Sequence, residues 1–239
     1  MAPSPADTTN TLGQPVGWPV QVERTEAPTR QPMVGTYCDL VALHPTAHTA
    51  DLFDAFASAP DDGDWTYLPY GPFETESEFA EWVASVVGLD DPMFFTVIDR
   101  ATGKAVGVAS YLRLDPRGAV IEVGHIHFSR RMQKTPMATE AMYLMMRRAF
   151  EGGHRRYEWK CDELNAPSQA AARRLGFRYE GRFRQATHYK GRNRNTAWFS
   201  ILDHEWPALR DEFERWLASD NFDADGNQLT VLANRADEQ

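Results

Sequence analysis

Apolar residues follow a strand period in some segments of the chain and a helix period in others. Residues 34–43 form an apolar run typical of a strand, and residues 45–58, opened by Pro45, repeat apolar side chains at helical spacing. A second helix is predicted over residues 75–87, after an aromatic, proline-bounded stretch (65–73) that predicts irregular structure. The N-terminal part of the domain therefore predicts one strand and two helices.

Three strands are predicted next, because apolar runs at 93–98, 104–114 and 119–128 are separated only by short turns with Gly or Pro. A polar loop then leads into an amphipathic helix over residues 135–151, with Thr135 as N-cap and Pro136 at its first position. Its apolar stripe consists of Ala138, Ala141, Met142, Met145 and Ala149.

The last third of the domain predicts a strand (155–162), a short helix capped by Asn165 and ended by Gly176, a hairpin (177–202) and a final helix (204–217). One strand–helix–strand crossover thus lies within an otherwise antiparallel sheet. This order predicts an α/β (α+β) fold with a mixed, mostly antiparallel seven-stranded sheet and helices on both faces. We expect an extended, proline-rich arm at 1–32, the domain at 33–218, and a loose polar tail at 219–239.

Composition is that of an ordinary soluble globule, with 42% hydrophobic and 25% charged residues. The net charge of −9 argues against general nucleic-acid binding. Residues 173–194 nevertheless carry eight basic side chains against one acid, Glu180. This run is either a solvated face or a local anion site within an acidic protein.

No apolar stretch is long enough to span a membrane, and the first ten residues lack the pattern of a signal peptide. The two cysteines, Cys38 and Cys161, are far apart and have no neighbours typical of a metal site. We therefore expect a cytoplasmic protein with no disulfide and no metal.

Residues 130–141 connect an apolar strand to a helix through a short polar loop. A helix start presents unpaired N–H groups and the positive end of the helix dipole, so it attracts phosphate oxygens. Most strand–loop–helix junctions bind nothing, and this segment alone leaves both interpretations open.

Two motifs resemble those of the GCN5-related N-acetyltransferases (GNAT). Gln133-Lys134-Thr135-Pro136-Met137-Ala138, followed by Thr139-Glu140-Ala141, is similar to the family's motif A in its RimJ/RimL branch. Residues 165–181, from Asn165-Ala166-Pro167-Ser168 to Leu175-Gly176-Phe177, look like motif B, and residues 121–125 resemble the family's fourth strand. The resemblance covers roughly residues 34–206 and implies the GNAT fold.

The resemblance implies acetyl-CoA bound in a gap between the fourth and fifth predicted strands. Backbone groups near His127, Phe128 and Ser129 would pair with its pantetheine arm. The other cofactor contacts implied are Gln133, Lys134, Thr135, Met137, Ala138, Thr139, Asn165 and Arg173. Pro136 departs from the pattern, because it replaces a glycine whose N–H would meet the pyrophosphate, and this loss predicts weaker cofactor binding.

Direct attack by an amine requires a general base and a proton for the leaving thiolate. Glu122 is the candidate base, since partial burial on an apolar strand would raise its pKa; the alternative is a solvated, outward-facing side chain. Asn165 and Ser168 are placed beside the thioester, or serve only as a helix cap. His125 and His127 are either proton relays or structural histidines.

Trp159, Trp198, Tyr70 and Arg184 are the candidate substrate-binding residues, with aromatic core as the alternative for the rings. Together with the basic run they are similar to acetyltransferases that modify the α-amine of aminoacyl nucleotides, such as the domain that detoxifies processed microcin C. The expected activity is therefore acetyl transfer to a primary amine of a small molecule. The alternatives are N-terminal acetylation of a protein or peptide and a non-catalytic acyl-CoA sensor. A homodimer is compatible with the sequence.

Overall fold

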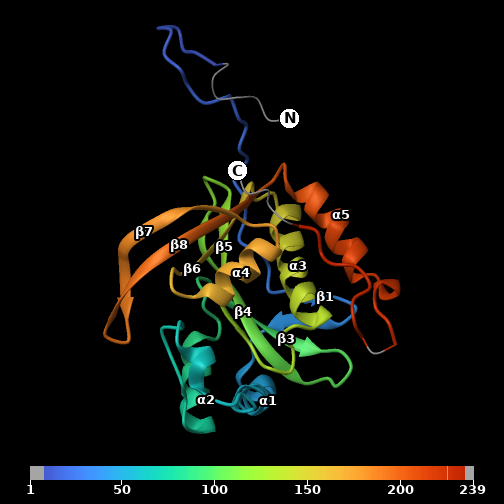
Figure 1. Cartoon of the computed structure of the whole chain (residues 1–239). Helices are drawn as coiled ribbons and strands as arrows, with labels where there is room; N and C mark the ends of the chain where they lie inside the picture. The colour runs from blue at the N-terminus through green and yellow to red at the C-terminus, as the bar shows by residue number, and fades with distance from the viewer. Residues whose placement is uncertain (1–7, 225, 235–239) are drawn as a thin grey trace.

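A computed structural model describes residues 8–224 and 226–234 and contains one central sheet (Figure 1). Its strands are Met33–Val34 (β1), Cys38–Ala42 (β2), Met93–Asp99 (β3), Ala105–Asp115 (β4), Val120–Phe128 (β5), Arg156–Asp162 (β6), Arg178–Tyr189 (β7) and Arg192–Leu202 (β8). The spatial order is β1-β2-β3-β4-β5-β6-β8-β7. All neighbours are antiparallel except β5 and β6, which are parallel and joined by a crossover helix. The predicted mixed sheet is confirmed.

The sheet has eight strands rather than the seven predicted, because the first apolar run is divided in two. Between β1 and β2, the backbone N–H groups of Thr36, Tyr37 and Cys38 all donate to the buried carboxylate of Glu140, at 2.6, 2.6 and 2.8 Å. A Cβ at Gly35 would lie only 2.5 Å from Glu140 Oε2, so glycine is required there. A helical side chain about a hundred residues away therefore interrupts the strand.

Five α-helices cover the two faces of the sheet, as predicted: Pro45–Ala57 (α1), Glu76–Val86 (α2), Pro136–Glu151 (α3), Ala166–Arg174 (α4) and Trp206–Leu217 (α5). α1 and α2 pack together over β4, while α3, α4 and α5 lie on the opposite face (Figure 1). The predicted stripe of α3 is confirmed, since Ala141, Met142, Met145 and Ala149 are at most 1% exposed. Each face thus has its own hydrophobic core.

The tail expected to be loose is packed against α5 in its described part. Leu232 and Asn234 are buried, and Asn221 binds both the Thr230 backbone and the carbonyl of Trp216. Apolar and amide side chains spaced along a mostly polar segment provide these contacts. Residues 219–224 and 226–234 are therefore docked rather than loose, and residues 225 and 235–239 of the predicted tail lie outside the described residues.

The first described residues of the arm project away from the body and form a turn closed by the Thr9–Pro15 bridge, and the arm then continues as extended chain to the first strand (Figure 1). Arg148 on α3 donates to the carbonyls of Thr29, Gln31 and Pro32, and Thr25 N donates to Pro116 O at 3.2 Å. Leu12 and Val20 are half or more exposed. The arm is therefore anchored near its C-terminal end and exposed farther upstream. None of the helices in the described part of the chain is both long and apolar enough to cross a bilayer.

Candidate active site at the parting of two parallel strands

β5 and β6 pair only over part of their length. The parallel ladder runs from the Val120–Arg156 pair to the Val123–Trp159 pair and then stops. At the same place β5 carries an extra residue against β4, because Val108 pairs with His127 but Ser110 pairs with Gly124. His125 adopts a φ of 50°, consistent with this bulge. The bulge turns β5 away from β6 and opens a gap between them.

The loop after β5 is shaped by its own hydrogen bonds. The N–H groups of Met132 and Gln133 both donate to Ser129 O, at 3.0 and 3.1 Å, and the Gln133 side chain donates to Phe128 O at 2.7 Å. Lys134 has a φ of 62°, in the left-handed region. The loop is thus a compact turn that delivers the chain to the start of α3.

Unpaired donors gather where α3 begins. Pro136 occupies its first position, as predicted, so the free N–H groups of the first turn belong to Met137 and Ala138. The buried Ser129 hydroxyl has no partner among the described residues. A buried hydroxyl and a helix start both need acceptors, so these groups fit the phosphate oxygens of a nucleotide cofactor.

Two threonines predicted to contact the cofactor are engaged within the protein. The Thr135 hydroxyl donates to Met132 O at 2.7 Å and does not cap the helix with its side chain. Thr139 is 4% exposed, and its hydroxyl accepts a hydrogen bond from Arg174 at 3.0 Å. The Thr135 hydroxyl therefore binds the loop, and the Thr139 hydroxyl binds α4 through Arg174.

Glu122 lies on β5 immediately before the parting of the strands. Its carboxylate is 2.6 Å from Lys160 Nζ and 3.2 Å from Arg113 Nε, and its side chain is 7% exposed. A Cβ at Gly124 would lie 3.7 Å from Glu122 Oε1, which places the carboxylate against the bulge. Burial raises the pKa of Glu122, although Lys160 and Arg113 act in the opposite direction. The candidate base is thus buried and ion-paired, not solvated.

Asn165 and Ser168 lie together at the start of α4, beside the end of β6. Asn165 Oδ1 accepts from Ser168 N at 3.1 Å, so the predicted cap is confirmed. The Ser168 hydroxyl accepts from Trp159 Nε1 at 3.0 Å. Trp159 is 5% exposed and packs on Phe177 in the core. Trp159 therefore supports the start of α4.

The candidate substrate-binding side chains do not share one pocket. Trp159 pairs with Phe199, while the adjacent pair joins Lys160 and Trp198, so the two tryptophans point to opposite faces of the sheet. Arg184 is exposed on the edge strand β7, where it lines a shallow hollow with Ala197 on the α4 side. Of the four, Trp198 and Tyr70 lie on the face that carries Glu122, which is the face covered by α1 and α2.

Tyr70 belongs to an aromatic cluster between the sheet and the helices α1 and α2. Its ring stacks on His125 with centroids 5.6 Å apart and lies 4.5 Å from that of Trp82. His127 stacks on Phe56 at 3.9 Å. Burial lowers the pKa of His125 to about 4 and that of His127 to about 3. Both imidazoles are therefore neutral at pH 7, and the His127 ring serves packing.

The basic run does not form one surface either. The guanidinium of Arg173 lies over the rings of Tyr179 and Phe199, 5.5 and 5.1 Å from their centroids. Lys190, at the hairpin tip, donates to Trp65 O at 2.7 Å, and Tyr67 donates to Leu164 O at 3.0 Å. Lys190 thus joins the hairpin tip to the aromatic loop, and Tyr67 joins that loop to the segment between β6 and α4.

Three residues of this site were missed in the sequence: Lys160, Glu158 and Arg113. Lys160 Nζ lies 2.9 Å from Glu158 Oε2 in addition to its contact with Glu122. The available signal was the alternation of charged residues on an otherwise apolar strand, 156–162. Alternation indicates a shared face, but the partner on β5 depends on a parallel register that sequence patterns do not specify.

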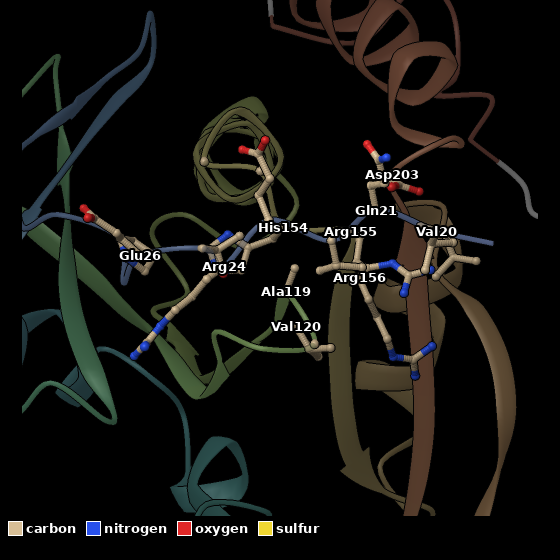
Figure 2. A pocket seen from close by; sticks show the side chains of 18 of the residues that line it. Val20, Gln21, Arg24, Glu26, Ala119, Val120, His154, Arg155, Arg156 and Asp203 are labelled. Atoms are coloured by element: carbon tan, nitrogen blue, oxygen red, sulfur yellow. The ribbon is translucent and has the colours of Figure 1, made fainter.

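A separate cavity of about 1180 Å³ lies under the arm, at the opposite, paired ends of β5 and β6 (Figure 2). Val20 and Arg24 of the arm, Val120, and Arg155 and Arg156 are among its lining residues. The cavity is therefore distinct from the gap. In the described part of the chain, no three His, Cys, Asp or Glu side chains are grouped to hold a metal ion.

Comparisons with known proteins agree with this geometry. Residues 40–178 match the family model of the acetyltransferase (GNAT) domain. The structure is similar to a GCN5-related N-acetyltransferase from Brucella melitensis, with 44% identity, a TM-score of 0.86, and coverage of 88% of this chain and 96% of that one. A GNAT-family acetyltransferase from Chromobacterium violaceum shows 40% identity, a TM-score of 0.73, and coverage of 86% and 100%.

More distant similarity is restricted to the fold. An acetyl transferase from Salmonella typhimurium that modifies the N-terminal serine of ribosomal protein L7/L12 shows 19% identity, a TM-score of 0.61, and coverage of 72% and 99%. No curated protein matches the chain. The family model covers more than half of the chain, and the Brucella protein shares its fold over most of both lengths. The chain belongs to the GNAT acetyltransferases, a family that uses acetyl-CoA as co-substrate.

Proposed function

We propose that this acetyltransferase acetylates a primary amine of a small molecule, such as the α-amine of an aminoacyl nucleotide, with Glu122 as the general base. One observation carries the proposal: a buried carboxylate lies against the bulge where β5 leaves β6. A carboxylate with a raised pKa can take a proton from an attacking amine near neutral pH.

Groups at the loop and helix start fit the cofactor. The N–H groups of Met137 and Ala138 and the Ser129 hydroxyl, which are free donors in this structure, would hold its phosphates together with the N–H of Lys134. When bound, acetyl-CoA supplies an acetyl group activated as a thioester. Asn165, at the start of α4 near the end of β6, would donate a side-chain hydrogen bond to the leaving sulfur, and the hydroxyl of the adjacent Ser168 would give that sulfur its proton.

The acceptor would enter from the face that carries Glu122 and Trp198. There the Trp198 ring lies 4.6 Å from the Phe183 ring, and the Arg113 guanidinium lies 5.7 Å from the Trp198 centroid. Aromatic rings stack planar groups and guanidinium ions bind anions, which supports an acceptor with a base and a phosphate. The contacts of the aromatic loop with Lys190 and Leu164 favour an acceptor whose amine-bearing end is slender.

The acceptor class is tested by acetyl-CoA turnover, measured as thiol release with mass analysis of the product. The panel contains a non-hydrolysable aminoacyl nucleotide, the free amino acid and a peptide with a free N-terminus. We expect kcat/KM to be at least tenfold higher for the nucleotide. Equal or higher kcat/KM for the peptide would replace this acceptor with a protein N-terminus. Tight CoA binding without thiol release for any amine would indicate a sensor instead.

A further inference from the structure

Lys160 occupies a closed site made of two carboxylates and an aromatic ring. Its Nζ lies 2.6 Å from Glu122 Oε2, 2.9 Å from Glu158 Oε2, and 3.5 Å from the centroid of the Trp198 ring. The side chains of Lys160 and Glu122 are each 7% exposed and that of Glu158 is 9% exposed. A buried ammonium placed this way is paired on three sides, so its position is fixed.

β4 and β6 contribute further charges to this site, and β8 contributes an uncharged ring. β4 contributes Arg113, whose Nε is 3.2 Å from Glu122 and whose side chain is 61% exposed. β6 contributes Arg156, which binds Glu158 at 2.7 Å and also binds Glu180 of β7. β8 contributes the uncharged Trp198. Lys160 is thus the buried cation that separates the two buried carboxylates.

We propose that Lys160 is a positioning residue that holds the Glu122 carboxylate against the bulge and keeps it ionised, while Glu158 holds Lys160 in place. The proposal rests on the proposed function, because it takes Glu122 as the base. A base must be deprotonated before it accepts a proton, and burial alone would favour its neutral form. The neighbouring ammonium offsets burial, so the same carboxylate can be both dry and charged.

Substitutions at Lys160 and at its partner Glu158 should shift the pH dependence of kcat/KM in opposite directions. Lys160→Met leaves Glu122 buried beside Glu158 without the cation between them, so the acid limb of kcat/KM should move up by about one to three pH units. Glu158→Gln removes the like charge and leaves Lys160 to Glu122 alone, so the acid limb should move down. Lys160→Arg should restore most of the wild-type profile, because the cation is kept.

The measurement is the pH profile of kcat/KM with one acceptor for all variants, so that the pKa of the acceptor amine is common to them. ¹³C NMR of carboxyl-labelled glutamate, with the Glu122 signal assigned from Glu122→Gln, follows the same titration without turnover. Lys104→Met is the matched control: it breaks a lysine–carboxylate pair of 2.8 Å with Asp51 on the surface and should not move either midpoint.

Unmoved midpoints in Lys160→Met, with activity reduced equally at every pH, would overturn the proposal. If that variant does not fold, Glu158→Gln carries the test, and a midpoint that stays or rises would overturn it. If Glu122 is not the base, the experiments give a result different from the one that overturns the role of Lys160. An acid limb that persists in Glu122→Gln removes Glu122 as the base, whereas the NMR titration still reports whether Lys160 controls its charge.

Discussion

On β5, the side chains of Glu122 and His127 are both buried, but they meet different neighbours. Glu122 contacts cations on two adjacent strands, whereas the His127 ring lies against Phe56 and Trp65, with centroids 3.9 Å from each. The first environment tolerates a charge and the second does not. Two titratable residues five positions apart on one strand are thereby suited to proton transfer and to packing, respectively.

Glu122→Gln tests the proton-transfer role. The amide keeps the shape of the side chain but cannot take a proton, so kcat/KM should fall by about 10²- to 10⁴-fold. The dissociation constant for CoA, measured by calorimetry, should stay within about twofold because the loop is untouched. Glu81→Gln, at an exposed position on α2, is the control and should leave both quantities unchanged. Undiminished turnover of Glu122→Gln over the full pH range would remove Glu122 from the role.

His127→Phe tests the packing role through acid stability. The pKa of His127 is about 3 in the folded protein and near 6.5 when unfolded, so the unfolded chain binds the extra proton as the pH falls. The wild-type protein therefore loses roughly 2 kcal/mol through this group between pH 7 and pH 5, and stability is fully present only above the unfolded pKa. His125, with a pKa of about 4, adds to the same loss.

In His127→Phe the ring packing is kept and this pH dependence is lost. Urea unfolding at pH 7 and pH 5 should show a smaller difference than in the wild-type protein, by roughly 2 kcal/mol. His188→Asn, on the exposed hairpin, should behave like the wild type. An unchanged pH dependence in His127→Phe would contradict the prediction.

At the scale of elements, the start of α3 combines two features of opposite effect. The helix presents free N–H groups toward the loop, yet its first residue, Pro136, has no N–H to give. Proline at this position fixes φ at a helical value and restricts the unfolded chain. The junction therefore gains stability and gives up one hydrogen-bond donor.

Pro136→Ala should separate these effects. Alanine adds the missing N–H and keeps the helix, so CoA should bind about tenfold more tightly if that donor meets a phosphate. The free energy of unfolding should fall by about 0.4–1 kcal/mol from the added freedom of the unfolded chain. Calorimetry and urea unfolding measure the two quantities, and Pro136→Gly should show a larger loss of stability with the same gain in affinity. Unchanged affinity in both variants would show that no phosphate lies at this position.

The Glu140 carboxylate joins α3 to the turn between β1 and β2. Glu140→Gln removes the charge and replaces one acceptor oxygen by a donor, so one of the three N–H groups is left unsatisfied. The free energy of unfolding should fall by about 3 kcal/mol, as measured by urea unfolding. Glu151→Gln, exposed at the other end of the same helix, should change it by less than about 0.5 kcal/mol. A loss no larger than that of the control would refute the role of Glu140.

Element types followed from the sequence because each depends on local periodicity, caps and turns. The split between Val34 and Cys38 did not, because nothing nearby in sequence shows that Glu140 will bind three consecutive amides there. The candidate site also contains residues that local sequence patterns indicate and residues that depend on long-range contacts. Glu122, Asn165 and the loop are candidates that local patterns indicate, whereas Lys160 has no such local signal, since its proposed role depends on the register of two parallel strands.

At the scale of the whole molecule, the described chain is one sheet with an added segment at each end. The arm is anchored by Arg148, while the C-terminal segment buries Leu232 in the core shared with α3 and α5. The two ends therefore differ in their contribution: one lies mainly on the surface, and the other completes the packing.

Truncation should reveal this difference. A chain that begins at Glu23 should keep its melting temperature within about 3 °C, because the upstream arm is exposed. A chain that begins at Asp39 should not fold cooperatively, because it lacks the three amides that satisfy Glu140. Circular dichroism melts of both chains measure the effect. A cooperative melt of the second chain near the wild-type temperature would contradict it.

The contact between Glu140 and the Thr36–Cys38 amides spans 102 to 104 residues. Loop closure over such a distance is slow, since the intervening strands must be ordered before the ends meet. Glu140 lies one helical turn after Pro136, so the start of α3, to which the cofactor loop leads, is docked beside β1 and β2 only when this closure is complete. During refolding, CoA binding should consequently appear together with the last, long-range step of assembly, and a fluorescent CoA analogue would report the arrival of the native state.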